Sequence, residues 1–134
     1  MPEAAEPEDA RRVGRELTGA QLAAGAVRFA AELASLAALI TWGLHGVGGA
    51  LGWLLAIAAP ALFAVVWGAF LAPRAPRRLH DPARLVAEVV LFGLAAIALF
   101  AADLPVLGVI DAVVAVLGIV LVRWGPGATP DGVA

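Results

Sequence analysis

The chain contains no cysteine and no lysine, and charged residues make up only 15% of its 134 positions. The absence of cysteine excludes disulfide bonds, thiolate metal sites and cysteine nucleophiles. All nine basic residues are arginine, in a chain rich in alanine, glycine, valine and leucine. This bias is typical of GC-rich bacterial coding sequence rather than of a nucleic-acid-binding surface, so we expect no nucleic-acid partner.

What the chain has in excess is apolar residues, at 62% of all positions. A soluble domain carries roughly 45–50% apolar and about 25% charged residues. Nearly every charge lies in one of three short stretches, and long apolar runs separate these stretches. The pattern predicts an integral membrane protein.

Four apolar segments are long enough to cross a bilayer, which takes roughly 20 helical residues. The predicted fold is therefore all-α, an integral membrane four-helix bundle with helices at about 19–44, 50–72, 82–102 and 105–124. Pro60 is expected to kink the second helix, because its ring removes a backbone hydrogen bond. Residues 1–17 and 125–134 are predicted to be tails.

The arginines predict the orientation of the bundle. They lie in the N-terminal tail, in the central loop with the start of the third helix, and at the end of the fourth helix. The two turns on the opposite side contain no basic residue of this kind. Because positively charged segments stay in the cytoplasm, both termini are predicted to be cytoplasmic, in a bacterial plasma membrane.

Helices 1 and 3 share a short pattern. Residues 28–33 read Arg-Phe-Ala-Ala-Glu-Leu, and residues 84–89 read Arg-Leu-Val-Ala-Glu-Val. The chain is thus open to interpretation as two pseudo-symmetric helical hairpins related by an axis along the membrane normal. A chance match in an alanine-rich chain is the alternative.

Charged residues inside membrane helices are costly and usually face the bundle interior or a water path. Arg28 with Glu32, and Arg84 with Glu88, are each four residues apart and share a helical face. One interpretation is ion pairs that fix the packing of the helices, since arginine holds carboxylates well. The other is a polar vestibule for an ion, a proton or an anionic headgroup.

Asp111 is predicted to lie in the outer half of the membrane, where no arginine is expected. Only Thr41, His45 and Asp103 are candidate polar neighbours at that depth. We expect a neutral carboxyl there, because burial in an apolar medium disfavours the charged form. It is either a hydrogen-bonded structural group or a site for a proton or cation.

No catalytic, cofactor or metal site is predicted. His45 and His80 fall on opposite sides of the membrane, so one chain cannot use both as ligands of a haem or metal. The glycines between residues 46 and 52 do not have the spacing of a phosphate-binding loop. An enzyme is therefore not expected.

The loop Ala-Pro-Arg-Ala-Pro-Arg-Arg-Leu at residues 72–79, the Arg28–Glu32 segment and the sequence following Glu88 together resemble the YrdB-like family of small bacterial membrane proteins. The likeness covers about residues 25–124. It implies four spans and a bacterial plasma membrane. That family has no established function, so the resemblance supplies no site residues.

These observations favour a non-enzymatic membrane protein that packs with itself or with a membrane partner, because alanine and glycine dominate the expected packing faces. The alternative is a small proton-coupled transporter or channel that uses Glu32, Glu88 or Asp111. A weaker alternative is a scaffold that binds anionic lipid headgroups through Arg74, Arg77 and Arg78.

Overall fold

The computed structural model describes residues 19–125 and 128. Within this part of the chain all regular structure is helical, which confirms the predicted all-α class. Four helical segments are long and apolar enough to cross a membrane: Gly19–Val47, Gly49–Leu71, Ala83–Ala101 and Pro105–Trp124. The predicted tail at residues 1–17 lies outside the described residues, as does most of the tail at 125–134.

The first span consists of α2 (Gly19–Thr41) and the π-helical segment η1 (Trp42–Val47), which continues it. The span thus ends at Val47, beyond the end expected near residue 44, because the chain widens into a π turn before it leaves the helix. Gly48 and Gly49 then form the turn with φ angles of 69° and 63°. Residues with a Cβ atom rarely adopt such angles, so glycine is needed here.

The second span is α3 (Gly49–Val66), which continues as the π-helical segment η2 (Trp67–Leu71). Pro60 lies inside α3, and the helix continues on both sides of it. A loop leads to α4 (Ala83–Ala101), and a short turn joins α4 to α5 (Pro105–Trp124).

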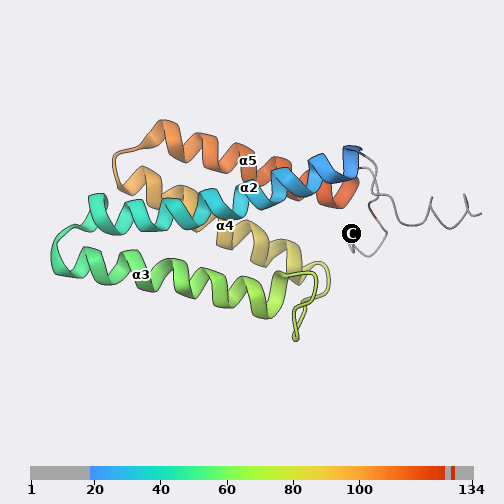
Figure 1. Cartoon of the computed structure of the whole chain (residues 1–134), viewed down its shortest axis with the longest axis horizontal. Helices are drawn as coiled ribbons and strands as arrows, with labels where there is room; N and C mark the ends of the chain where they lie inside the picture. The colour runs from blue at the N-terminus through green and yellow to red at the C-terminus, as the bar shows by residue number, and fades with distance from the viewer. Residues whose placement is uncertain (1–18, 126–127, 129–134) are drawn as a thin grey trace, which may run out of the picture.

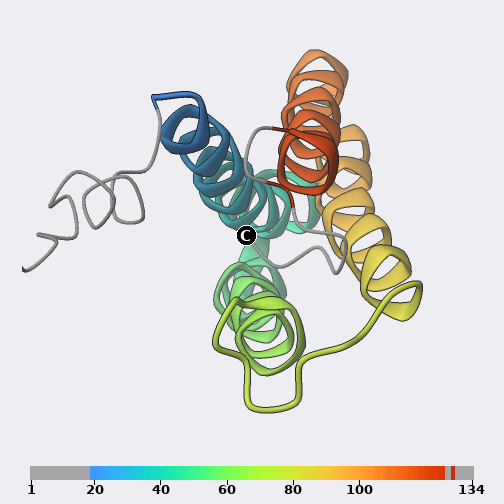
Figure 2. The same cartoon turned by 90° about the vertical axis from the view of Figure 1, so that its right-hand side faces the viewer.

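The central helix of the bundle is α2, which packs against α3, α4 and α5. In Figure 1, α5 lies above α2 and α3 lies below it, and α4 runs behind α2; Figure 2 shows the four spans from the loop end. α2 packs closely along α5, but α4 touches the first hairpin chiefly through α2, η1 and η2 rather than along α3. The two hairpins are therefore not equivalent in their packing.

Alanine supplies half of the buried core. The members of this core are Ala31, Ala38, Leu39, Phe63, Phe92, Ala95, Ala98, Leu99, Ala115 and Ile119. Alanine at a helix interface lets the backbones approach closely, which is how membrane helices gain packing energy when lipid is as apolar as the side chains. Large apolar side chains, in contrast, are exposed on every helix, where lipid chains would cover them.

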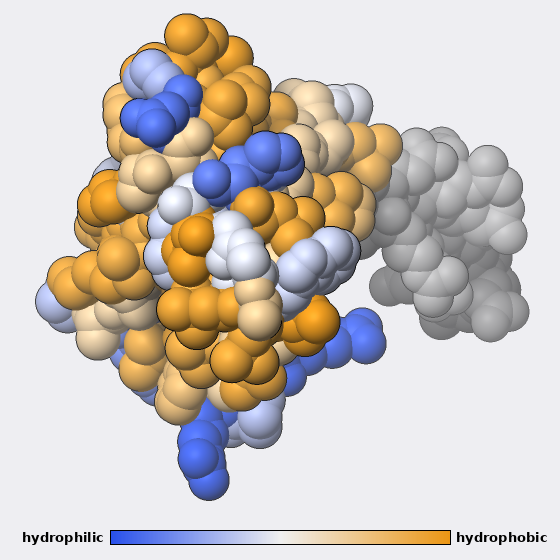
Figure 3. Space-filling model, turned by 90° about the vertical axis from the view of Figure 1, so that its left-hand side faces the viewer, coloured by the Kyte–Doolittle hydropathy of each residue, from blue (hydrophilic) through white to orange (hydrophobic). Residues whose placement is uncertain are grey.

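The two ends of the bundle differ in polarity. We call the end that carries loop 72–82 with Arg28, Arg84 and Arg123 the loop end, and the end with the turns at residues 48 and 102–104 the turn end. The start of α2, the end of η2, the start of α4 and the end of α5 all meet at the loop end (Figure 1). Figure 3 looks onto the turn end, where hydrophobic residues predominate and hydrophilic ones form separate patches.

Candidate functional site

Arg28 and Glu32 begin the polar cluster at the loop end. They lie one turn apart on α2, and the Arg28 Nε donates a hydrogen bond of 3.2 Å to Glu32 Oε1. Both side chains are largely buried. The four-residue spacing therefore produces the pair within one helix that the sequence suggests.

Glu88 of α4 is the centre of this cluster. Its side chain is only 2% exposed, and its Oε1 accepts hydrogen bonds from Arg84 Nε at 3.3 Å and from Arg28 Nη2 at 3.1 Å. The Nη2 of Arg123 lies 3.8 Å from Glu88 Oε2. One buried carboxylate thus joins α2, α4 and α5, and its charge is compensated inside the protein.

Arg123 also forms a short ion pair at this end. Its Nη1 and Nη2 each donate a 2.8 Å hydrogen bond to the carboxylate of Asp81, which lies just before α4. This bidentate geometry suits the planar guanidinium. The hydrogen bond from Arg123 holds the pKa of Asp81 below its ordinary value. The pair therefore ties the end of α5 to the start of α4.

An aromatic contact extends the cluster towards α3. The guanidinium carbon of Arg28 lies 4.9 Å from the centre of the Phe92 ring, which is a favourable position for a cation over an aromatic face. Phe92 in turn meets Phe63 of α3 edge to face, with ring centres 5.7 Å apart. Arg28 is thus held by two carboxylates and one ring from two helices.

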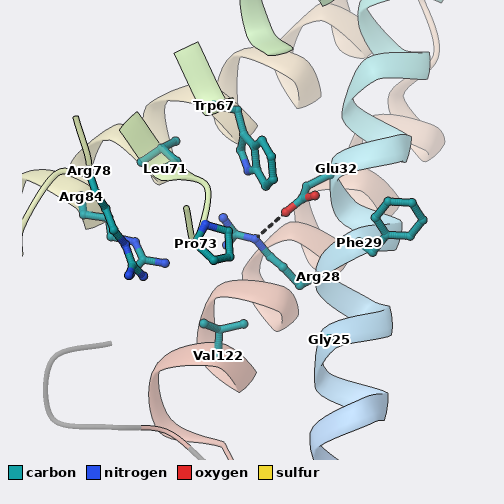
Figure 4. Close-up of a pocket in the computed structure, with 10 residues that line it drawn as sticks. All are labelled: Gly25, Arg28, Phe29, Glu32, Trp67, Leu71, Pro73, Arg78, Arg84 and Val122. Carbon is teal, nitrogen blue, oxygen red and sulfur yellow. Dashed lines mark hydrogen bonds and ion pairs between the residues drawn. The ribbon is translucent and has the colours of Figure 1, made fainter. Parts of the chain in front are cut away.

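A pocket of about 270 Å³ opens beside this cluster. Its polar lining comes from Arg28 and Glu32 of α2, Arg78 of the loop and Arg84 of α4, and Trp67 and Leu71 supply part of its apolar wall (Figure 4). The Nη1 of Arg28 is buried and has no hydrogen-bond partner among the described residues. The pocket therefore presents three cationic side chains and one carboxylate, with an N–H group that remains to be satisfied.

The three arginines expected to contact lipid headgroups are placed differently from one another. Arg78 is half-buried and lines the pocket, whereas Arg74 and Arg77 are exposed and do not line it. Trp67, near one end of its span, forms part of the pocket wall rather than only an outer anchor. Of these three loop arginines, Arg78 thus lines the pocket, together with residues of the helices.

Asp111 lies apart from this cluster, near the start of α5 at the turn end. It is 3% exposed, and neither of its carboxyl oxygens has a hydrogen-bond partner among the described residues. Its polar neighbour is Ser35 of α2, which is fully buried and whose hydroxyl likewise makes no hydrogen bond of standard geometry within the described chain. Thr41 lines the same cavity of about 220 Å³, whereas His45 and Asp103 do not.

The structure thus gathers four of the five predicted polar residues, Arg28, Glu32, Arg84 and Glu88, and separates Asp111 from them. Sequence reasoning missed Arg123 and Asp81 as partners in the cluster, although both fall at segment ends on the arginine-rich side. It also missed Ser35. The spacing Arg28, Glu32, Ser35 was the available signal, because steps of four and three place polar residues on one helical face.

The two histidines lie at opposite ends of the bundle, His45 in η1 and His80 in the loop before α4. Among residues 19–125 and 128, no group of three or more histidine or acidic side chains is arranged to hold a metal ion.

The fold and this charge distribution define a multi-pass, all-helical membrane protein with an ion-pair cluster at one end of its bundle. The family model for proteins of unknown function designated DUF2568 matches residues 26–116, which is most of the chain. The chain belongs to that family. No curated protein and no solved structure matches it.

Proposed function

We propose that this protein is a non-enzymatic component of a bacterial plasma membrane that acts by associating with a second copy of itself through α3. Its two termini lie in the cytoplasm in this proposal. The support for the orientation is that Arg28, Arg84, Arg123 and the loop arginines gather at the same end of the bundle. Positively charged segments remain on the cytoplasmic side during insertion.

The observation that carries the association is the position of α3. It is the least buried of the four spans and packs mainly on α2 and η1, at the edge of the bundle. Ala58, Ala61 and Ala64 are exposed at three-residue spacing along one side of it. Small residues on a lipid-facing side allow another helix to approach closely.

The test is the oligomeric state in lipid. We expect energy transfer between donor- and acceptor-labelled chains in liposomes, at protein-to-lipid ratios where chance proximity is negligible. Ala61→Phe should abolish it, because the ring keeps the helices apart, and Ala30→Phe on an exposed part of α2 should leave it unchanged. A chain that stays monomeric, or an Ala61→Phe protein that associates as before, would rule the proposal out.

The separation of the carboxylates supports this function over proton-coupled transport. Glu32 lines the pocket at the loop end, Asp111 lines the cavity at the turn end, and Glu88 lines neither. A transport path needs titrating groups that reach water or one another in sequence. Glu88 is instead held by arginines from three helices.

A second candidate function, binding of an anionic lipid, is favoured by the arginine-lined pocket at the loop end. A phosphate group there would face Arg28, Arg78 and Arg84, and the acyl chains would pass Phe29 and Leu71. An arginine at an anionic surface contributes about 1 kcal/mol. Arg78→Ala should therefore weaken retention of phosphatidylglycerol in native mass spectrometry several-fold, and Arg74→Ala, outside the pocket, should not.

In that experiment phosphatidylcholine is the reference lipid. Equal retention of the two lipids by the unaltered protein, or equal losses in the two arginine variants, would count against a specific site.

The likeness to the YrdB-like proteins, carried by residues 72–79 and Glu88, stays a proposal about ancestry. It adds no activity to either candidate.

A further inference from the structure

A second cavity, at the turn end, lies between α2, α4 and α5 and has a volume of about 220 Å³. Its walls include Ala37 and Thr41 of α2, Leu99 of α4, and Leu107, Ile110 and Asp111 of α5. The cavity is distinct from the pocket at the loop end, with which it shares no lining residue. Among the residues that the structure describes, Asp111 is the only ionisable side chain that lines it.

The carboxyl group of Asp111 has hydrogen-bonding capacity that the described protein leaves largely unused, with the Ser35 hydroxyl as its one polar neighbour of note. It is 3% exposed, and both oxygens lack a hydrogen-bond partner among the described residues, as does the neighbouring Ser35 hydroxyl. Leaving a buried polar group without a hydrogen-bond partner is unfavourable, and more so for a charged group. A ligand with N–H groups would supply what this site lacks.

Charge compensation at Asp111 has no source among the arginines of the described helices. These arginines, Arg28, Arg84 and Arg123, belong to the cluster at the loop end. Asp111 precedes Arg123 by twelve residues of α5, or about 18 Å of helical rise. An ammonium group on a ligand would therefore be an ion-pair partner that none of these arginines supplies.

The apolar side chains of the cavity wall favour a ligand with a hydrocarbon part. Leu107 and Ile110 line the cavity and are also 48% and 52% exposed on the outer side of the bundle, where lipid would lie. The cavity thus borders the lipid phase through apolar side chains. An amphiphilic molecule dissolved in the membrane can reach it without crossing water.

We propose that this cavity binds a small lipophilic amine. Its ammonium N–H groups donate to the Asp111 carboxylate, and its hydrocarbon part packs against Ala37, Leu99 and Leu107. A hydrogen bond between charged partners is the strongest kind that side chains form. This site is independent of the association through α3 and of the arginine-lined pocket.

The test is a calorimetric titration of the full chain in nanodiscs with octylamine and octan-1-ol, with empty nanodiscs subtracted. We expect saturable binding of octylamine, and binding of octan-1-ol weaker by roughly tenfold or more, since hydrogen bonds to charged groups contribute about 1.5–3 kcal/mol and about 1.4 kcal/mol is a factor of ten. Asp111→Asn should lower octylamine affinity to a similar extent. Asp103→Asn, an exposed carboxyl at the same end that does not line the cavity, should leave it unchanged.

A second measurement needs no variant, in case Asp111→Asn does not fold. A photoreactive alkylamine should cross-link the unaltered protein within residues 34–41 and 107–114, and excess octylamine should suppress the labelling. Labelling confined to other segments would overturn the proposal. Octylamine uptake that does not saturate, that is equal in the unaltered and Asp111→Asn proteins, or that octan-1-ol matches would overturn it as well.

Discussion

At the scale of single residues, Glu88 is a buried carboxylate whose charge is compensated by three arginines. It is nearly fully buried and its two oxygens face arginines of three helices. In a medium of low dielectric, removing one member of such a cluster leaves charge without compensation. The stability of the loop end therefore depends on this carboxylate.

Glu88→Gln should lower the free energy of unfolding by about 3–5 kcal/mol, the loss typical of a broken buried ion pair. Glu32→Gln should cost clearly less, because the ion pair of Glu32 is with Arg28 and its side chain is more exposed than that of Glu88. Combining Glu88→Gln with Arg28→Ala should cost less than the sum of the two single changes. Unfolding by denaturant in detergent gives the free energy of unfolding of each variant. Strictly additive losses would show that Arg28 and Glu88 do not interact.

The Asp81–Arg123 pair predicts a pH dependence of stability. Because the pKa of Asp81 is lowered in the folded protein, the pair stabilises the fold fully above the ordinary pKa of an aspartate, about 3.9. That contribution is lost as pH falls through the lowered pKa. Since Asp81 is partly exposed, the effect should be within about 1 kcal/mol.

The measurement for this pair compares the stability of the unaltered protein with that of Asp81→Asn between about pH 7 and pH 2, which brackets the ordinary aspartate pKa. The stability difference should be constant at neutral pH and should shrink as the pH falls below the ordinary aspartate pKa. A difference that persists unchanged at the acid end would show that the substitution disturbs the fold for a reason other than charge.

The sequence predicted that the arginines and glutamates of α2 and α4 form ion pairs, within or across helices, but its spacing identified particular partners only within each helix. Arg28–Glu32 and Arg84–Glu88 follow from four-residue spacing, because the geometry of one helix fixes them. The contact of Arg28 with Glu88 depends on how α2 and α4 are positioned along each other. That position is set by the packing of many small side chains, and no local pattern encodes it.

At the scale of helices, the first hairpin is held by a very close approach of η1 and α3. A Cβ atom on Gly43 would lie 2.5 Å from the backbone nitrogen of Ala56, and one on Gly52 would collide with the carbonyl oxygen of Gly43. Backbone atoms cannot move aside as a flexible side chain can. The two glycines thus allow a contact that any larger residue would prevent.

Gly43→Ala and Gly52→Ala should each destabilise the protein by about 1–3 kcal/mol, as expected of overpacking. Gly93→Ala on α4 is the matched control, because a Cβ atom there meets nothing within 4 Å. It should be neutral or slightly stabilising, since alanine favours helix more than glycine does. Thermal unfolding in detergent checks the set, and equal melting temperatures for all three variants would refute the close approach.

Hydropathy and glycine positions were enough to predict four helices, because a span must satisfy its own backbone hydrogen bonds in lipid. The π-helical segments η1 and η2 were not predicted. In these segments Trp42 and Trp67 pack against the core. This placement depends on the packing of neighbouring helices. Local sequence carries no comparable signal.

At the scale of the whole molecule, the chain offers a natural background for mapping its topology, because it contains no cysteine. With cytoplasmic termini, Leu104→Cys at the turn end should react with a membrane-impermeant maleimide added to intact cells. Arg77→Cys in the loop should react only after the membrane is opened. The reverse pattern would show that the proposed orientation is wrong. The arginine-lined pocket would then face the outer leaflet rather than the cytoplasmic one.

In the proposed function, the buried charges hold the bundle together and the protein works by association rather than by moving protons. The most direct measurement is proton flux into liposomes that contain the purified protein, under an imposed pH gradient. We predict flux no greater than in empty liposomes, and no difference between the unaltered protein and its Glu32→Gln and Asp111→Asn variants. Flux above that background that either variant abolishes would contradict the account.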